Sequence, residues 1–250
     1  MITGFDLRKG DCLELMKKLG DESIDMICCD LPYGSTKNKW DCPIDLNLLW
    51  EQYKRIIKPN GAIVLFAQTP FDKVLGVSNL EMLKYEWIWK KDNATGFLNS
   101  NFAPLKIHEN ILVFSKASAA FVKDKSKAMH YYPIKESGKP YTVKQGSRSK
   151  NYDAKNMIQG FETKNTGDRF PKSILHFKRD KDKLHPTQKP VALLEYLIKT
   201  YTKEGEIVLD NCMGSGSTGV ACLNTNRQFI GMELDEKYYN IAIERLNVGN

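Results

Sequence analysis

The sequence predicts an α/β fold in which helices flank a mostly parallel β-sheet. An apolar run at 24–29, interrupted only by Asp25, and a continuous apolar run at 62–67 are typical of strands buried on both faces. Segments with helical periodicity alternate with such runs, and the same alternation returns between residues 190 and 246. A length of 250 residues suits one α/β domain with room for a small inserted region.

The first part of the chain divides into alternating short strands and helices. We expect strands at 5–7, 24–29, 62–67, 85–90 and 109–115, and helices at 11–19, 46–57 and 71–83. Asp45 is suited to cap the second helix, which Pro59-Asn60-Gly61 is expected to end. The polar residues 35–43 and the Asn-, Phe- and Pro-containing residues 96–104 are predicted to be loops.

The last part of the chain has the same character. Strands are expected at 206–210 and 228–233, and helices at 190–201, 220–224 and 235–246. Residues 211–219 form a glycine- and serine-rich loop between a strand and a helix. No internal repeat is visible, so the chain does not belong to the repeat proteins.

The middle of the chain, residues 116–184, lacks strong periodicity and is basic. Residues 116–183 hold 17 Lys and Arg against 7 Asp and Glu, whereas the remainder holds 20 against 23. The interleaved aromatic residues are Tyr131, Tyr132, Tyr141, Tyr152, Phe161, Phe170 and Phe177. Basic and aromatic side chains together suit a nucleic-acid-binding surface. The alternatives are a small subdomain with an aromatic core and a lysine-rich loop without a partner.

The composition argues against several other classes of protein. No run of about 18 apolar residues is present, and the first residues lack the apolar stretch of a signal peptide, so we expect a cytoplasmic protein without a membrane span. The six cysteines form no C-x-x-C pair and are expected to be reduced. The four histidines lack the spacing of paired ligands, so no metal site is predicted.

The first candidate site is Asp30-Leu31-Pro32-Tyr33-Gly34, which follows an apolar run. Ligands of open α/β sheets bind at the carboxyl ends of strands. Pro32 biases Leu31 towards an extended conformation, which can leave the Leu31 carbonyl as an acceptor. Asp30, that carbonyl and the Tyr33 ring suit a flat group that carries an amine. The alternative is an ordinary strand-to-loop turn.

The second candidate site is the stretch Val208-Leu-Asp-Asn-Cys-Met-Gly-Ser-Gly-Ser-Thr-Gly219. Glycines let a ligand approach the backbone closely, and a helix N-terminus offers free N–H groups. Glu233 ends the next predicted strand, where a carboxylate can accept hydrogen bonds from ribose hydroxyls. These features predict a site for a nucleoside-containing cofactor. The loop is not a P-loop, because no G-K-[ST] follows.

Three stretches resemble motifs of the DNA amino-methyltransferases. Asp30–Tyr33 is similar to their D-P-P-Y motif, Asp210–Thr218 to their S-adenosylmethionine loop D-P-F-x-G-S-G-T-T, and His185–Pro190 to their H-P-T-x-K-P signature. Their order resembles the β group, which includes adenine methylases of phages and restriction–modification systems. The resemblance implies a Rossmann-like S-adenosylmethionine-dependent methyltransferase fold. Residues 1–115 would be its catalytic half, 116–184 an inserted target-recognition region and 185–250 its cofactor-binding half.

The resemblance also implies an activity and a set of roles. Methyl transfer from S-adenosylmethionine to the N6 amino group of adenine in duplex DNA would follow flipping of the base. Asp30 and the Leu31 carbonyl would accept the amine hydrogens behind the stiff Pro32, and Tyr33 would stack on the base. Asp11 would hold the cofactor's adenine and Glu233 its ribose. The other expected cofactor-binding residues are Asp30, His185, Thr187, Gln188, Lys189, Asp210, Asn211, Cys212, Gly214, Ser215, Gly216 and Thr218.

Three positions depart from the family's motifs. Leu31 replaces a proline, which matters little if only its carbonyl acts, whereas Asn211 and Cys212 replace Pro-Phe and should alter how the cofactor's adenine packs. Asp30 in place of serine favours adenine over cytosine. The alternatives are cytosine-N4 methylation, methylation of RNA or a protein amide, an inactive nucleic-acid-binding relative and a dinucleotide oxidoreductase. Expected partners are double-stranded DNA, a second copy in a homodimer, and a cognate restriction endonuclease or a phage context.

Overall fold

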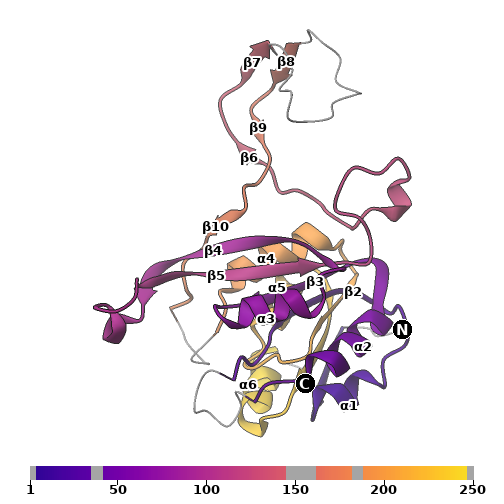
Figure 1. Ribbon diagram of the computed structural model, residues 1–250. Helices are drawn as coiled ribbons and strands as arrows, with labels where there is room; N and C mark the ends of the chain where they lie inside the picture. The colour runs from indigo at the N-terminus through magenta and orange to yellow at the C-terminus, as the bar shows by residue number, and fades with distance from the viewer. Residues whose placement is uncertain (1–3, 35–41, 145–161, 182–187, 247–250) are drawn as a thin grey trace. The chain divides into compact units, whose positions relative to one another are not determined.

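The computed structural model describes residues 4–34, 42–144, 162–181 and 188–246 (Figure 1). The chain forms two compact units, of which the first combines Met1–Tyr132 with Ser173–Asn250 and the second is Pro133–Lys172. The basic region predicted at 116–184 encloses the second unit. The residues of the basic region on either side of the second unit belong to the first unit. The N-terminal and C-terminal parts of the chain therefore form one compact unit.

The first unit contains a sheet to which the described residues contribute eight strands, in the order β1-β12-β11-β2-β3-β5-β4-β10. The strands are β1 (Phe5–Lys9), β2 (Ile24–Asp30), β3 (Ile57–Ala67), β4 (Leu83–Thr95), β5 (Lys106–Phe114), β10 (Ile174–His176), β11 (Ile207–Asp210) and β12 (Gln228–Glu233). Strand β5 is antiparallel to β3 and β4, and the other pairs are parallel. The prediction of a mostly parallel sheet is confirmed.

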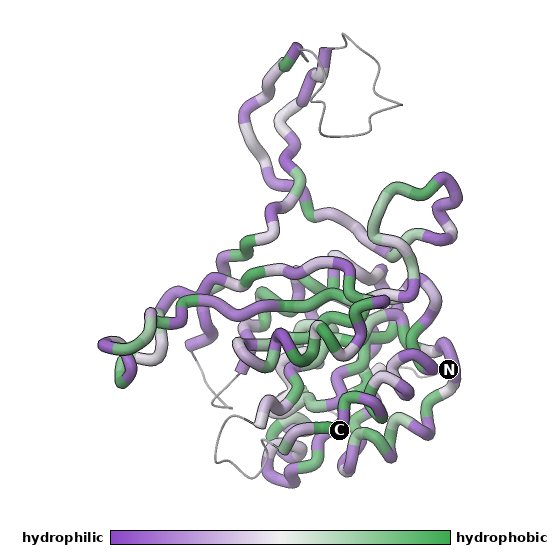
Figure 2. Tube along the Cα trace, viewed as in Figure 1, coloured by the Kyte–Doolittle hydropathy of each residue, from purple (hydrophilic) through white to green (hydrophobic). Residues whose placement is uncertain are grey.

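Helices cover both faces of this sheet (Figure 1). On one face lie α1 (Cys12–Met16), α2 (Leu46–Ile56) and α3 (Phe71–Ser78), and on the other lie α4 (Val191–Tyr201), α5 (Ser217–Asn224) and α6 (Glu236–Leu246). Strand β2 serves both layers, because Met26 and Cys28 pack towards α4 while Ile27 and Cys29 pack towards α1–α3. Burial on both faces explains why the central strands are mainly apolar. They are green in the middle of the sheet in Figure 2.

The topology brings the two candidate sites together. In the sheet, β2 lies between β3 and β11. The chain passes from β2 to its neighbour β3 on one side, and from β11 to its neighbour β12 on the opposite side. Val208 pairs with Met26 and Leu209 with Ile27, so the parallel strands β11 and β2 end at the same edge of the sheet. Such a switch point is where open α/β sheets bind ligands. Asp30 and Asp210 both stand at this edge.

Some predicted boundaries were wrong. Helix α2 has its predicted cap at Asp45 but ends at Ile56, and β3 begins at once, so Pro59-Asn60-Gly61 lies inside a strand. The strand conformation follows from pairing with β2: the register of β2 and β3 shifts between Ile24 and Met26, and a Cβ on Gly61 would lie 2.7 Å from the Asp25 carbonyl. Helices α1 and α3 are shorter than predicted, and α5 begins at Ser217 rather than at 220.

The part of the basic region that belongs to the first unit contains irregular structure and the short 3₁₀ turn Lys125–Lys127. A second 3₁₀ turn, Phe97–Asn99, lies before this region, between β4 and β5. Tyr131 lies against Tyr201, with ring centroids 6.3 Å apart, and Phe177 lies 5.7 Å from Tyr196. These two aromatic residues therefore pack on the first unit.

The described residues of the second unit form two short antiparallel pairs of strands. Strand β6 (Glu136–Ser137) pairs with β9 (Asp168–Arg169), and β7 (Tyr141–Lys144) pairs with β8 (Glu162–Asn165). Tyr141 is 45% exposed and Phe170 67% exposed, and their rings face the cationic groups of Arg169 and Lys135. Among its described residues the unit has no buried aromatic core, which leaves these rings available at the surface. Tyr152 and Phe161 lie outside the described residues.

None of the helices that the structure describes is both long enough and apolar enough to cross a membrane.

Replacing Leu197 by alanine tests the packing of α4. Leu197 is fully buried between the helix and the sheet, so we expect Leu197→Ala to lower the free energy of unfolding by about 2–5 kcal/mol. Urea denaturation measures this change. Lys199→Ala, on the same helix but with a half-exposed side chain, is the control and should change stability by less than about 0.5 kcal/mol. Equal losses in the two variants would contradict the packing of α4.

Candidate active site

A cleft of about 970 Å³ opens at the edge of the sheet where β2, β11 and β12 end. Asp30 and Tyr33 line it from the first part of the chain, and Asp210 and Glu233 line it from the last part. The volume is at the upper end of the range for small-molecule sites. The two candidate sites of the sequence therefore share one cleft.

Asp30, the last residue of β2, is held at both carboxylate oxygens. The Tyr33 hydroxyl donates a hydrogen bond of 2.7 Å to Oδ1, and the Lys189 ammonium forms an ion pair with Oδ2. Burial raises the pKa of Asp30, and the positive charge of Lys189 opposes that shift. The contacts fix the plane of the carboxylate.

The next three residues form the wall beside Asp30. Leu31 is 3% exposed and its side chain packs in the core under α1–α3, while no described residue donates to its carbonyl. Pro32 and Tyr33 line the cleft. The Tyr33 ring stacks on Phe71, with centroids 5.0 Å apart and planes 28° apart. One ring face is thus supported by protein.

Lys189 contacts Asp30 and Glu109 rather than the glycine-rich loop. Its ammonium bridges Asp30 and Glu109, with 3.3 Å to Oε2 of Glu109, and lies 5.2 Å from the Phe66 ring centroid. Burial by itself would lower the pKa of Lys189, but the two carboxylates outweigh that effect and raise it. Lys189 is therefore a buried cation.

The rest of the H-P-T-Q-K-P stretch is described only in part. Gln188 lines the cleft, donates a hydrogen bond of 3.1 Å to Asp180, and lies 3.5 Å from the Ser215 hydroxyl, which donates to its Oε1. This contact links Gln188 to the glycine-rich loop. His185 and Thr187 lie outside the described residues, as do residues 35–41 of the loop predicted at 35–43.

The glycine-rich loop turns sharply between β11 and α5. Gly214 and Gly216 have φ values of 52° and 79°, in the left-handed region that favours glycine. Gly214 and Ser215 line the cleft, whereas Gly216 packs against Ala242, 3.1 Å from where its Cβ would lie. Gly216 therefore shapes the loop from behind.

Asp210 and Asn211 hold this loop in place by side-chain hydrogen bonds, and both also line the cleft. Asp210 is 4% exposed and accepts hydrogen bonds of 2.6 Å from the Thr218 hydroxyl and 3.1 Å from the Cys212 amide. Burial raises the pKa of Asp210 to about 6. Asn211 accepts a hydrogen bond of 2.5 Å from the Tyr53 hydroxyl. These contacts tie the loop to its own strand and to α2.

Cys212, where the family usually has an aromatic residue, lies among other thiols. Its side chain contacts those of Cys12 and Cys29, and these contacts raise the pKa of Cys212 well above its ordinary value. Cys12 and Cys212 both line the cleft. Small sulfur-containing side chains thus form the wall at this point.

Glu233 presents a preset carboxylate at the end of β12. Its Oε2 accepts a hydrogen bond of 2.9 Å from the Gly214 amide, and Oε1 accepts one of 2.8 Å from the Asp235 amide. Burial raises the pKa of Glu233. Each oxygen keeps a lone pair for a further donor, so the carboxylate can accept a pair of hydroxyls. Leu234, 65% exposed, adds an apolar surface to the same end of the cleft.

Asp11 caps helix α1 and also lines the cleft. Its Oδ1 accepts hydrogen bonds of 2.8 Å from the Leu13 amide and 3.2 Å from the Glu14 amide. Asp11 is therefore the N-cap of α1 as well as a residue of the cleft wall. A further hydrogen bond, from a ligand in the cleft, would use the remaining lone pairs of the carboxylate.

Comparison with known proteins places this site in a family. The family profile for N6/N4 methyltransferases, described as DNA methylase, matches residues 24–244. The chain is 30% identical over 253 residues to the type II methyltransferase M.HpaI of Haemophilus parainfluenzae, covering 95% of this chain and 72% of that protein. It is 29% identical over 259 residues to the DNA adenine methyltransferase YhdJ of Escherichia coli K12, covering 96% and 82%.

The chain belongs to the N6/N4 DNA methylase family. The methylase also resembles solved structures. It matches M1.HpyAVI in complex with SAM at a TM-score of 0.63 and 25% identity, covering 98% of this chain and all of that one. The cytosine-N4-specific PvuII DNA methyltransferase matches at a TM-score of 0.70 and 15% identity, covering 100% and 89%, which shows a shared fold. The predicted S-adenosylmethionine-dependent methyltransferase fold is confirmed.

The cofactor of the methylase is S-adenosylmethionine, as the sequence predicted. The chemistry of the cleft fits it: the Glu233 carboxylate suits the ribose hydroxyls, and Leu234 is an apolar surface for a flat ring. Among the residues that the structure describes, no group of His, Cys, Asp and Glu side chains is placed to hold a metal ion.

Four residues of the methylase site were missed by sequence reasoning: Lys91, Glu109, Tyr53 and Arg245. Glu109 lies within β5 and Lys91 within β4, and both are buried charges in the cleft wall. Arg245 donates 2.9 Å to the Ser217 hydroxyl and 3.2 Å to the Ser215 carbonyl. The sequence signal that could have found Lys91 and Glu109 was a charged residue inside or beside an apolar run.

Asp210→Asn tests the burial of this carboxyl group. Its pKa is about 6 in the folded methylase against 3.8 ordinarily, so the folded state binds the proton more tightly and stability falls as pH rises between these values. The variant lacks this titration. Its stability relative to the wild type should therefore rise by up to about 3 kcal/mol from about pH 4 to about pH 7.

Denaturant titrations across this pH range measure the difference. Asp45→Asn, at an exposed helix cap that asparagine also satisfies, is the control. A difference between Asp210→Asn and wild type that does not change with pH would contradict the burial of Asp210.

Proposed function

We propose that this DNA methyltransferase transfers a methyl group from S-adenosylmethionine to the N6 amino group of adenine in duplex DNA. The observation that carries the proposal is the arrangement around Asp30. Its oriented carboxylate, the Leu31 carbonyl and the supported Tyr33 ring share a cleft with Glu233 and the glycine-rich loop.

Asp30 and Leu31 would activate the target amine. An amine attached to a nucleobase is a weak nucleophile, because its lone pair is delocalised into the ring. Hydrogen bonds from its two N–H groups to the Asp30 carboxylate and the Leu31 carbonyl would return electron density to the nitrogen. Both acceptors are held by the end of β2 and the stiff Pro32, so positioning contributes much of the rate.

Tyr33 would hold the ring of the target base. The ring stacks on Phe71 on one side and lines the cleft, and the hydrogen bond to Asp30 fixes its hydroxyl. Stacking of a base on an aromatic side chain is worth about 1–3 kcal/mol. A base inside a duplex cannot reach such a cleft, so we infer that the target nucleotide is flipped out.

The other end of the cleft would hold the cofactor. When bound, S-adenosylmethionine supplies a methyl group activated by its sulfonium charge. Glu233 would accept the ribose hydroxyls, Asp11 would accept from the adenine amino group, and the backbone of Gly214 and Ser215 would enclose the methionine part. Asp210 and Thr218 would act by keeping the loop in shape.

Adenine is favoured over cytosine by the residue at position 30. An aspartate, rather than the serine typical of cytosine-N4 relatives, begins the catalytic motif, and YhdJ, at 29% identity, is named a DNA adenine methyltransferase. Cytosine N4 is the second candidate, because the family profile covers both amines. The chemistry required of Asp30 is the same for each.

Two exposed surfaces support DNA as the substrate. The second unit displays Tyr141 and Phe170 beside cationic groups. The hairpin that joins β4 to β5 exposes Leu98 by 98% and Phe102 by 90%, and Thr95, at its base, lines the cleft. Apolar side chains on such a hairpin suit insertion between base pairs. We propose that 116–184 contains the target-recognition region.

Incubation with labelled S-adenosylmethionine and unmethylated genomic DNA tests the proposal. After digestion to nucleosides, we expect the label in N6-methyladenine. Asp30→Ala should lower the rate by about 10²- to 10⁴-fold, because it removes the carboxylate that faces the amine, and should leave cofactor affinity nearly unchanged.

Asp21→Ala is the matched control, since this carboxylate is 75% exposed and pairs with Arg55 away from the cleft. Label found only in N4-methylcytosine would replace adenine by the second candidate. Full activity of Asp30→Ala would refute the role of Asp30, and absence of any labelled nucleoside would refute the proposed function.

A further inference from the structure

A chain of buried charges runs behind Asp30. Lys189 pairs with Asp30 and with Oε2 of Glu109, and Lys91 pairs with Oε1 of Glu109. The side chains of Lys91, Glu109 and Lys189 are only 6–8% exposed. Gln68 also donates a hydrogen bond of 3.0 Å to Oε1 of Glu109. Two positive and two negative charges thus alternate in the cleft wall.

Glu109 is the branch point of this chain. Its two oxygens face different cations, Lys91 from the neighbouring strand β4 and Lys189 from the segment before α4. The register of β4 and β5 places Glu109 opposite Trp89, which brings Lys91 within reach. Glu109 therefore connects the antiparallel edge of the sheet to the residue that contacts Asp30.

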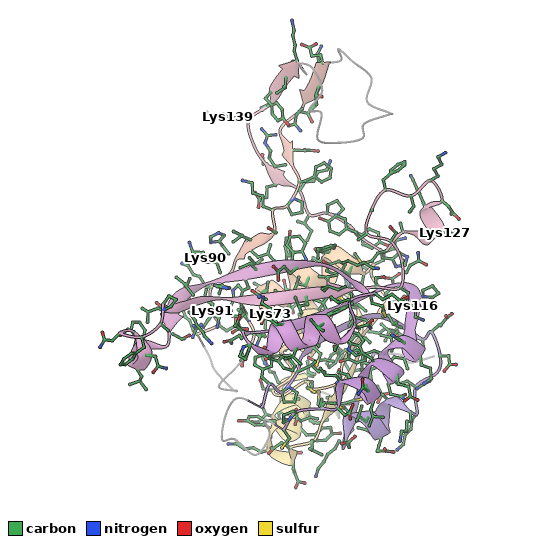
Figure 3. The ribbon with its side chains drawn as sticks, viewed as in Figure 1. Lys73, Lys90, Lys91, Lys116, Lys127 and Lys139 are labelled. Carbon is green, nitrogen blue, oxygen red and sulfur yellow. The ribbon has the colours of Figure 1, made fainter. Side chains whose placement is uncertain are left out.

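Lys91 and Glu109 depend on each other as ion-pair partners because both side chains are buried. An ion out of water is stabilised only by a close partner, and removing one partner leaves the other uncompensated. Lys90, which comes directly before Lys91 on β4, is exposed, because successive side chains of a strand point to opposite faces (Figure 3). Only Lys91 enters the wall of the cleft, although the two lysines are neighbours in sequence.

We propose that Glu109 is a positioning residue for methyl transfer, which fixes the Lys189 ammonium against Oδ2 of Asp30 and so sets the plane of the Asp30 carboxylate. The inference rests on the proposed function of Asp30. Lys189 contacts Oδ2 and the Tyr33 hydroxyl donates to Oδ1, and because Asp30 lines the cleft, its remaining lone pairs are left for a target amine. Without Glu109, the ammonium loses one of its two carboxylates and its position on Asp30.

Glu109→Gln tests the proposal, because it keeps the size of the side chain and removes its charge. We expect kcat for methylation of genomic DNA to fall about 10- to 100-fold, the effect of a misplaced catalytic group. The KM for DNA and the calorimetric Kd for S-adenosylmethionine should stay within about twofold of wild type, since Glu109 would act through Asp30 and not on the cofactor. Lys90→Met is the matched control and should retain the wild-type kcat.

A double variant separates positioning from simple charge balance. Glu109→Gln alone leaves Lys91 buried without a carboxylate, so its melting temperature should fall. Lys91→Met combined with Glu109→Gln removes both charges and should recover the melting temperature, but not kcat, because Lys189 still lacks Glu109. This split is the result expected of a positioning residue.

The outcomes that overturn the inference are distinct. Unchanged kcat in Glu109→Gln, or recovery of kcat together with stability in the double variant, would show that Glu109 only neutralises Lys91. The wild-type arm tests the proposed function separately: a wild type that binds S-adenosylmethionine and labels no DNA would refute that function, whereas the ratio of variant to wild-type rates tests Glu109.

Discussion

The buried ion pair between Lys189 and Asp30 is the interaction on which the rest of the site depends. It joins residues 159 apart in the chain, one at the end of β2 and one before α4. Charges out of water must be paired, so β2, β5 and the segment before α4 have to keep their relative positions. The end of the cleft that contains Asp30 is thereby fixed to the part of the chain that continues through α4 and β11 to the glycine-rich loop.

Much of the fold could be predicted because its signals are local. Apolar runs mark β2, the second half of β3 and β11, and Asp45 caps α2 as expected. The antiparallel placement of β5 and the strand conformation of Pro59-Asn60-Gly61 could not be predicted. Both follow from pairing with strands far along the chain, and Asn60 is further held by the carbonyls of Ser126 and Ala128.

The candidate site divides in the same way. Asp30 and Glu233 could be proposed because each ends a strand that the sequence marks clearly, and strand ends meet at one edge of the sheet. Glu109 and Lys91 could not, because their pairing depends on the register of β4 and β5. For Lys189 the sequence pointed to the cofactor, whereas its contacts lie with Asp30 and Glu109.

The most direct test of this account is the titration of Asp30 itself, followed by NMR of carboxyl-¹³C-labelled aspartate and assigned with Asp30→Asn. Burial raises the pKa of Asp30 and Lys189 opposes the shift, so the midpoint should lie above the ordinary value for aspartate. It should rise further in Lys189→Met, which lacks the cation on Oδ2. An ordinary midpoint in the wild type, or the same midpoint in both proteins, would contradict the claim that a buried Lys189 holds the carboxylate of Asp30.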